Sequence, residues 1–182
     1  AGLGLFGLRC IPMVGREEER DQLWTTLSDV HRHGRTRVVF LTGPAGSGTS
    51  RLSEWISTRA NELGAAHTIV LSHGVQDGPW QAIRFALERV VQSRGLTRIE
   101  IGERVAAFYQ RRGESRQDDI ELMTAFLDGE FDGDRKQISA LIARFFKLCC
   151  WTRPLLLRVE NVQWGREVKD VLQSLFESNL AE

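Results

Sequence analysis

A glycine-rich octapeptide, GPAGSGTS at residues 43–50, constrains the fold of this chain more than any other feature. It follows a β-branched run, RVVFLT at 37–42, and precedes a stretch from about Thr49 to Leu63 with apolar residues at helical spacing. This order predicts a buried strand at 37–42, then a loop, then a helix. Glycines in such a loop let the backbone curve so that several N–H groups point inward, toward an anion.

Strand-like and helix-like patterns alternate along the rest of the chain, as in proteins whose parallel sheet is covered by helices. Further strands are predicted at 68–72 and 155–159, and helices at 16–33, 80–91, 99–109, 120–126, 138–151 and 166–176. We therefore expect an α/β fold of three layers, a parallel sheet with flanking helices. We expect one domain at 14–182, preceded by a lead-in segment at 1–13.

Composition bears on partners and location. Basic and acidic residues number 24 each, so net charge gives no direct signal for nucleic acid. No apolar run approaches the roughly 20 residues that span a bilayer, and we expect no membrane contact. The adjacent Cys149 and Cys150 rarely suit a structural disulfide, which favours a cytoplasmic location. The chain begins at Ala1 rather than methionine, and we expect it to be part of a longer polypeptide.

The octapeptide fits the phosphate-binding pattern GxxxxGK[ST] except at Thr49, where the pattern has lysine. Ser50 stands where a hydroxyl ligates Mg²⁺. The residues predicted to bind nucleotide phosphates are Gly43, Pro44, Ala45, Gly46, Ser47, Gly48, Thr49 and Ser50. A hydrogen bond from a charged lysine contributes about 1.5–3 kcal/mol, so its loss weakens binding by roughly one to two orders of magnitude. We expect hydrolysis to be impaired as well, because the transition state loses its main protein cation. The alternative is a glycine-rich turn with no ligand.

A second motif, LLLRVEN at 155–161, is an apolar strand that ends in an acid. An acid in this position holds Mg²⁺, often through water, so Glu160 and Ser50 are the predicted metal site. The next position, which is catalytic in such motifs, is filled by Asn161, and an amide cannot act as a base. Arg158 interrupts the strand and must reach an edge, an acid or a partner; Glu160 lies on the same face. The alternative is a plain buried strand with a solvated Glu160.

Together these motifs resemble the NTPase core of the STAND branch of the AAA-like P-loop ATPases, which occur in large bacterial signalling proteins. The resemblance rests on VGRE at 14–17, GPAGSGTS at 43–50 and LLLRVENVQW at 155–164, in that order. In this family VGRE lies near the adenine, which implies that Gly15 and Arg16 bind nucleotide. The resemblance also implies ATP or ADP with Mg²⁺ as cofactors, and catalytic positions at Glu160 and Asn161.

The family comparison also implies a structural gap. The family sheet has five strands, and its fourth strand lies between the phosphate-loop strand and the strand that ends at Glu160. After Trp164 this chain offers one helix, so the late strands and the helical lid are missing. We expect an incomplete or rearranged sheet, or an oligomer formed through an open sheet edge.

These features imply a regulatory NTPase-like domain of a larger bacterial signalling protein. It would bind ATP or ADP weakly or not at all, and it would be an inactive or weak ATPase. One alternative is a pseudo-NTPase that acts only in protein–protein interaction or assembly. The other is an active ATPase with a substitute cation, from Arg158 or from a neighbouring subunit. The expected partners are other domains of the same polypeptide or separate proteins.

Several single residues are expected to be structural. His73 follows a predicted strand and is expected in a surface loop rather than in the nucleotide cleft. The adjacent cysteines are expected in the core, as small packing residues. The tryptophans at 24, 55, 80 and 151 lie mostly on apolar faces and are expected in the core, with Trp164 as the exception.

Overall fold

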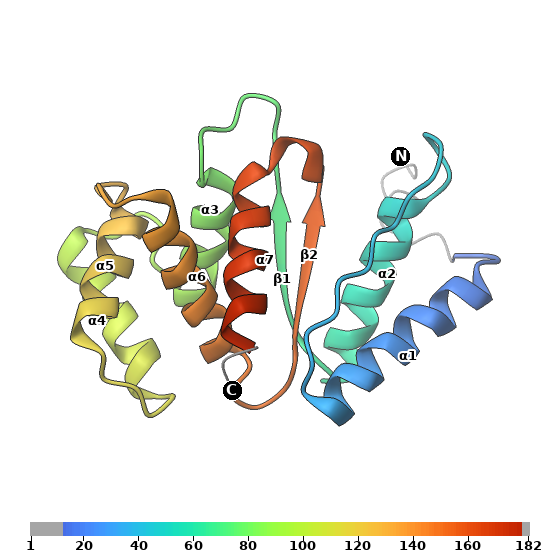
Figure 1. The fold of residues 1–182 in the computed structure, drawn as a ribbon, viewed down its shortest axis with the longest axis horizontal. Coiled ribbons are helices and arrows are strands. Elements are labelled where there is room, and N and C mark those ends of the chain that lie inside the picture. Colours follow the sequence, from blue (N-terminus) through green and yellow to red (C-terminus); the bar gives the residue numbers. More distant parts are fainter. Residues whose placement is uncertain (1–12, 180–182) are drawn as a thin grey trace, which may run out of the picture. The chain divides into compact units, whose positions relative to one another are not determined.

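The computed structural model describes residues 13–179. The chain divides into two compact units, Ala1–Ile56 and Ser57–Glu182, and each is described by itself. The lead-in segment predicted at 1–13 lies almost entirely outside the described residues. Figure 1 shows the course of the chain through both units.

The first unit contains α1 (Glu17–His33) and the start of α2 (Thr49–Glu62). Acidic side chains occupy the first turn of α1, where they favour the partial positive charge of a helix N-terminus. Gly34 ends the helix in a left-handed conformation (φ 65°), with its N–H bonded to the Val30 carbonyl. Both helices were predicted close to these bounds.

The strand predicted at 37–42 is wrong. Residues 34–43 have no regular secondary structure, and Val38, Val39 and Phe40 are exposed. β-branched residues favour extended backbone, but a strand also needs a neighbour for its N–H and C=O groups. Within the described part of the chain no strand pairs with this segment.

The second unit contains the sheet. β1 (His67–Ser72) and β2 (Leu155–Glu160) pair in parallel, in a register that sets His67 beside Leu155 and Ser72 beside Glu160. Both strands therefore end at the same edge. The α/β class with an incomplete parallel sheet is confirmed, since the described residues form two strands rather than the five of the family resemblance.

Helices fill the connection between the two strands (Figure 1). They are α3 (Gln81–Val91), α4 (Arg98–Gln110), α5 (Gln117–Asp128) and α6 (Arg135–Cys149), and β2 is followed by η2 (Val162–Trp164) and α7 (Arg166–Asn179). Local signals explain several of their ends. Thr97 and Glu100 form a capping box at α4, and the Asp134 carboxylate accepts the Gln137 N–H at the start of α6. The short η2 was not predicted.

The core of the second unit lies between its helices and its strands. α3 packs on β1, α4 on α5, and α7 on α6. The rings of Phe108 and Phe145 stack with centroids 4.5 Å apart at the centre of this core. The Asp119 carboxylate, nearly buried, accepts two hydrogen bonds from the Arg144 guanidinium, at 2.8 and 2.6 Å, and joins α5 to α6.

The end of α6 corrects two expectations. The helix stops at Cys149, which is buried as predicted, and burial raises the pKa of its thiol to about 12. Cys150 and Trp151 follow the helix and are exposed, so their predicted core positions are wrong. The helical periodicity of the sequence extends past the point at which the backbone turns toward β2.

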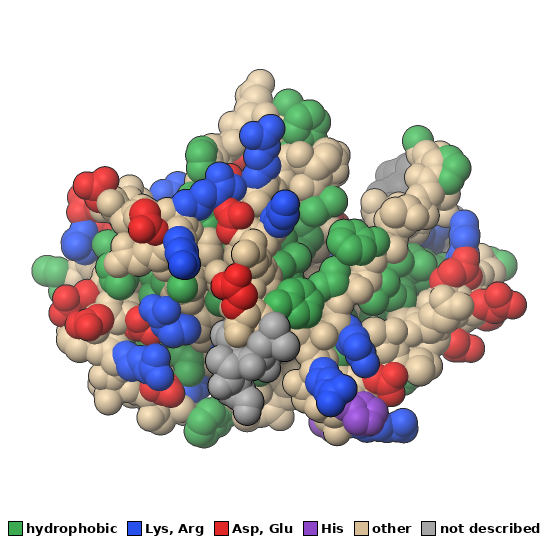
Figure 2. Space-filling model, viewed as in Figure 1, with side chains coloured by type: hydrophobic (Ala, Val, Ile, Leu, Met, Phe, Trp, Pro, Cys, Tyr) green, Lys and Arg blue, Asp and Glu red, His purple; other side chains and the backbone are tan. Residues whose placement is uncertain are grey.

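The surface of the second unit carries both signs of charge. On the face shown in Figure 2, lysine and arginine side chains are mixed with aspartate and glutamate over its helices. None of the helices in the described part of the chain is long and apolar enough to span a membrane.

Candidate functional site

The octapeptide at 43–50 forms a loop that leads directly into α2. Ser47 N–H bonds the Pro44 carbonyl at 3.0 Å, which closes a turn, and Leu52 N–H bonds the Gly48 carbonyl at 2.9 Å. Gly46 and Gly48 have φ values of 81° and 86°, which side chains rarely adopt. The curvature of the loop thus requires glycine at both positions.

Gly43 lies close to Ser47. A Cβ atom at this position would lie 2.5 Å from the Ser47 Oγ, so a side chain here would require the Ser47 hydroxyl to move. The Ser47 hydroxyl is buried and has no hydrogen-bond partner among the described residues. By contrast, a Cβ atom at Gly46 or Gly48 would meet nothing within 4 Å, which leaves that side of the loop open to a ligand.

Arg16 brings the VGRE segment onto the loop. One guanidinium nitrogen donates to the Ser47 carbonyl at 3.0 Å, and another pairs with the Glu19 carboxylate. The hydrogen bond from Arg16 lowers the pKa of Glu19. Gly15 and Arg16 both have left-handed backbone, with φ 77° and 66°, which turns the chain into α1 next to the loop. The structure therefore brings two of the predicted nucleotide-binding segments together.

Thr49 and Ser50 start α2. The first N–H groups of a helix have no partner within the helix and carry partial positive charge, so they favour an anion. Thr49 is half-buried and adds no charge, whereas Ser50 is exposed. The loop can thus surround a phosphate with backbone N–H groups, but its lysine position supplies no cation.

The second motif ends β2 in the other unit. The Arg158 guanidinium pairs with the Glu160 carboxylate at 3.2 Å, and the Arg158 side chain is 16% exposed. Of the three possibilities that the sequence left open for Arg158, the structure shows the acid on the same strand face, and this pairing offsets the cost of a charge inside the strand. Arg158 is thereby held by Glu160.

Asn161 ties the two strand ends together. It has left-handed backbone (φ 55°), which asparagine tolerates, and its side-chain N–H donates to the His73 carbonyl at 3.0 Å. In return, the Glu160 carbonyl lies 3.4 Å from the His73 backbone nitrogen and 3.3 Å from its Nδ1. An acid at position 161 would lack the donor that this contact uses.

His73 was missed as a member of this cluster. It is buried, with 6% of its surface exposed, so the expectation of a surface position is wrong. Since Ser72 lies beside Glu160 in the sheet, His73 and Asn161 are the residues that follow two neighbouring strand ends. The register between strands 67–72 and 155–160, had it been known, would have predicted that His73 lies beside Asn161.

The predicted site residues fall in both units. Gly15, Arg16 and residues 43–50 belong to the first unit, while Glu160 and Asn161 belong to the second. The predicted magnesium pair, Ser50 and Glu160, has one member in each. Its role in metal binding stays a prediction, as do the nucleotide-binding and catalytic roles.

Comparison with protein families found one that covers almost the whole chain. The family model described as AAA ATPase domain matches residues 12–179, which include the loop and both flanking motifs. Domains of this family generally use ATP and Mg²⁺. Searches of curated proteins and of solved structures found no match.

Proposed function

This chain belongs to the AAA ATPase domain family, and from that premise we propose that it is a regulatory nucleotide-binding domain of the STAND branch. It acts within a larger bacterial signalling protein in the cytoplasm. It binds ATP or ADP weakly, and its hydrolysis is impaired. The observation that carries this proposal is a phosphate loop with its glycine backbone intact and with Thr49 in the lysine position.

The loop backbone fits a phosphate group. Gly46 and Gly48 provide the curvature, and the side of the loop toward which their Cβ atoms would point is open. Mg²⁺, when bound, neutralises phosphate charge, and the Ser50 hydroxyl of the loop would be one of its ligands. Arg16 already contacts the loop through the Ser47 carbonyl, which suits it to orient the bound nucleotide.

Two side chains support weak hydrolysis. Thr49 supplies no charge where phosphoryl transfer needs a cation. Asn161 cannot accept a proton, and its amide is engaged by the His73 carbonyl. The Arg158 guanidinium, considered as a substitute cation, is paired with Glu160. These contacts favour a nucleotide-binding domain over an active ATPase.

The test is calorimetric titration of the chain with Mg-ATP and Mg-ADP, beside a Thr49→Lys variant. Lysine restores a charged hydrogen bond, so we expect the variant to bind about tenfold to a hundredfold more tightly. Thr49→Ser is the matched control, because it keeps a hydroxyl and adds no charge. We expect it to bind as the original chain does.

Each result separates the candidate functions. If neither the chain nor Thr49→Lys binds nucleotide, the proposal fails and the assembly function is favoured. If the original chain binds as tightly as the lysine variant, another group supplies the cation and the weak-binding proposal fails. Measured turnover of ATP by the unchanged chain at the rate of Thr49→Lys would contradict impaired hydrolysis.

We also propose that the open side of the sheet serves assembly. β2 pairs with β1 alone among the described residues, so its other edge has free backbone groups. The partner is another domain of the same polypeptide, a separate protein or a second copy. Analytical ultracentrifugation over a range of concentrations checks the last case, and a monomer at every concentration would contradict it.

A further inference from the structure

A small cavity lies at the end of β1, within the second unit. Its volume is about 110 Å³. Its lining includes His73, Asp77, Trp80, Ile83, Trp164 and Glu167. None of them belongs to the phosphate loop, although His73 contacts Glu160 and Asn161 at the strand ends.

The size of the cavity limits its occupant. Pockets for whole cofactors or drug-sized ligands measure about 300–1,000 Å³. A volume of about 110 Å³ lies well below this range. The cavity therefore suits one functional group, such as the head of a long side chain, rather than a nucleotide.

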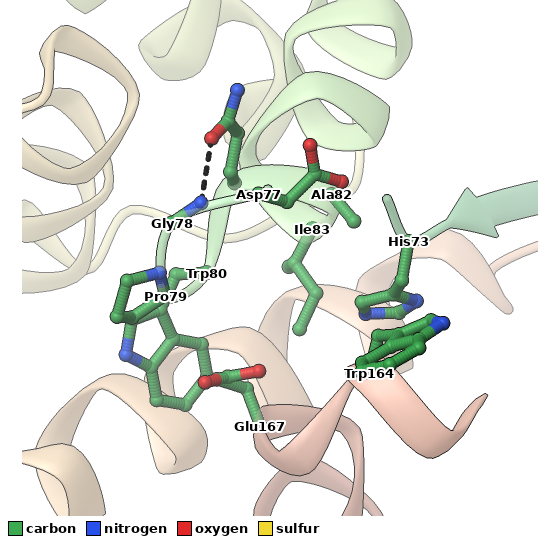
Figure 3. Close-up of a pocket in the computed structure, with 10 residues that line it drawn as sticks. His73, Asp77, Gly78, Pro79, Trp80, Ala82, Ile83, Trp164 and Glu167 are labelled. Carbon is green, nitrogen blue, oxygen red and sulfur yellow. Dashed lines mark hydrogen bonds between the residues drawn. The ribbon is translucent and has the colours of Figure 1, made fainter. Parts of the chain in front are cut away.

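Two indole rings are part of the cavity wall (Figure 3). The Trp80 indole and the Glu167 carboxylate lie on one side, the His73 ring and the Trp164 indole on the other, and Ile83 between them. Trp80 has left-handed backbone (φ 64°) immediately before α3, and Trp164 ends η2.

His73 fixes the second side of the cavity. A Cβ atom at Gly165 would lie 2.4 Å from the His73 Nε2, so the imidazole packs directly on the backbone that follows Trp164. The Glu160 carbonyl contacts the imidazole at Nδ1, 3.3 Å away. This wall is thus preformed by packing on the strand ends.

The charged groups of the cavity are acidic. Asp77 and Glu167 line it, and no lysine or arginine does so among the described residues. The Asp77 Oδ2 accepts the Gly74 N–H, which fixes the loop after β1. Glu167 has no hydrogen bond or ion pair in the described part of the chain; the Arg135 guanidinium interacts with it through space but is paired with Asp170. A half-buried carboxylate beside the Trp80 indole can therefore accept hydrogen bonds from a ligand.

We propose that this cavity binds an alkylguanidinium group, carried either by a small free molecule or by an arginine side chain of a peptide. A guanidinium is attracted by the faces of tryptophan rings and donates charge-assisted hydrogen bonds to a carboxylate. A guanidinium stacks on aromatic faces and is more weakly hydrated than an ammonium, so it suits a wall that contains indole rings better. The inference does not depend on nucleotide binding.

The test uses the full chain and the indole N–H signals of Trp80 and Trp164 in NMR spectra, assigned with Trp80→Phe and Trp164→Phe. Ethylguanidinium is titrated beside N-ethylurea, a neutral molecule of similar shape. We expect ethylguanidinium to shift both signals with saturation at a Kd of about 1 mM, as suits so small a ligand. N-ethylurea should bind at least about tenfold more weakly. Equal binding of the two, or no saturable shift with ethylguanidinium, would overturn the proposal.

Glu167→Gln tests the carboxylate, and Glu177→Gln is its matched control on the exposed part of the same helix. We expect Glu167→Gln to weaken ethylguanidinium binding about tenfold or more, and Glu177→Gln to leave it unchanged. Unchanged binding by Glu167→Gln would sink the assignment. The comparison of ethylguanidinium with N-ethylurea in the unmodified chain tests the proposal even if Glu167→Gln does not fold.

The source of the guanidinium is tested in a second titration. Ac-Gly-Arg-Gly-NH2 is compared with the same peptide carrying citrulline, which is neutral and of nearly the same size. Tighter binding of the arginine peptide than of ethylguanidinium assigns the site to a peptide partner, and the reverse order assigns it to a small molecule. If neither the arginine peptide nor ethylguanidinium binds more tightly than its neutral counterpart, the site does not recognise guanidinium.

Discussion

At the scale of single residues, two positions depart from the motifs in different ways. Thr49 stands in the lysine position of a loop whose glycine backbone is intact, so this change affects only the proposed contact with a phosphate. Asn161 replaces an acid, but its side chain makes a contact of its own, with the His73 carbonyl. Restoring the motif residue should therefore improve binding at the first position and damage the fold at the second.

Asn161→Asp is expected to lower the free energy of unfolding by about 1–3 kcal/mol. The variant loses a donor at 3.0 Å from a carbonyl oxygen and places a carboxylate against that oxygen. Because a protonated carboxyl can donate again, part of the loss should return below about pH 4. Urea denaturation at neutral and acidic pH measures both effects.

Gln163→Glu is the control for this prediction. It makes the same amide-to-acid change at an exposed position in η2. Its effect should stay within about 0.5 kcal/mol. If Asn161→Asp is as stable as the original chain, Asn161 does not support the strand ends.

At the scale of elements, the first residue of β1 is held by the turn that precedes β2. His67 N–H bonds the Pro154 carbonyl at 2.8 Å. The His67 Nε2 lies 3.2 Å from the Thr152 Oγ1 and accepts from the Arg153 Nε at 3.3 Å. The ring nitrogen that receives the guanidinium must be unprotonated, because an imidazolium has no acceptor.

This geometry predicts a pH effect. Burial, followed by the charges of Arg153 and Arg112, lowers the pKa of His67. The unfolded chain therefore takes up the His67 proton first, and stability that is present above about pH 6.5 is lost as the pH falls. Unfolding free energies from pH 8 to pH 5 should decline for the original chain. His67→Gln should decline less, and identical slopes would contradict the role of His67.

At the scale of the second unit, stability comes from the helices between the two strands rather than from the sheet. Two parallel strands alone bury little, whereas Phe145 and Phe146 of α6 are almost fully buried within the core. Phe108 stacks on Phe145 at 4.5 Å, and the Tyr109 ring lies 6.2 Å from it. The core is thus centred on α4 and α6.

Phe145→Ala is expected to lower the free energy of unfolding by about 3–5 kcal/mol, through lost burial and the cavity left behind. Phe85→Ala, which removes a ring that is 44% exposed, should cost about 1 kcal/mol or less. Chemical denaturation followed by circular dichroism compares the two. Similar effects of both changes would contradict a core centred on Phe145.

Some properties of this protein follow from local sequence alone. The helices, β1, β2 and the loop at 43–50 form where periodicity, caps and glycines predict them, because these signals act over a few neighbouring residues. The pairing of Arg158 with Glu160 was also foreseeable, since alternate residues of a strand share a face. The left-handed backbone of Gly46 and Gly48 was foreseeable as well, because glycine adopts it readily.

Other properties were decided only by tertiary structure. The run at 37–42 has strand-forming residues, but no described strand pairs with it, and pairing is a long-range property. The burial of His73 and its contact with Asn161 depend on the register between strands that are more than eighty residues apart in sequence, at 67–72 and 155–160. The sequence determines which local elements can form. Which strands pair and which side chains meet is decided by tertiary structure, because backbone hydrogen bonds between strands and contacts between side chains both join segments that are distant in the sequence.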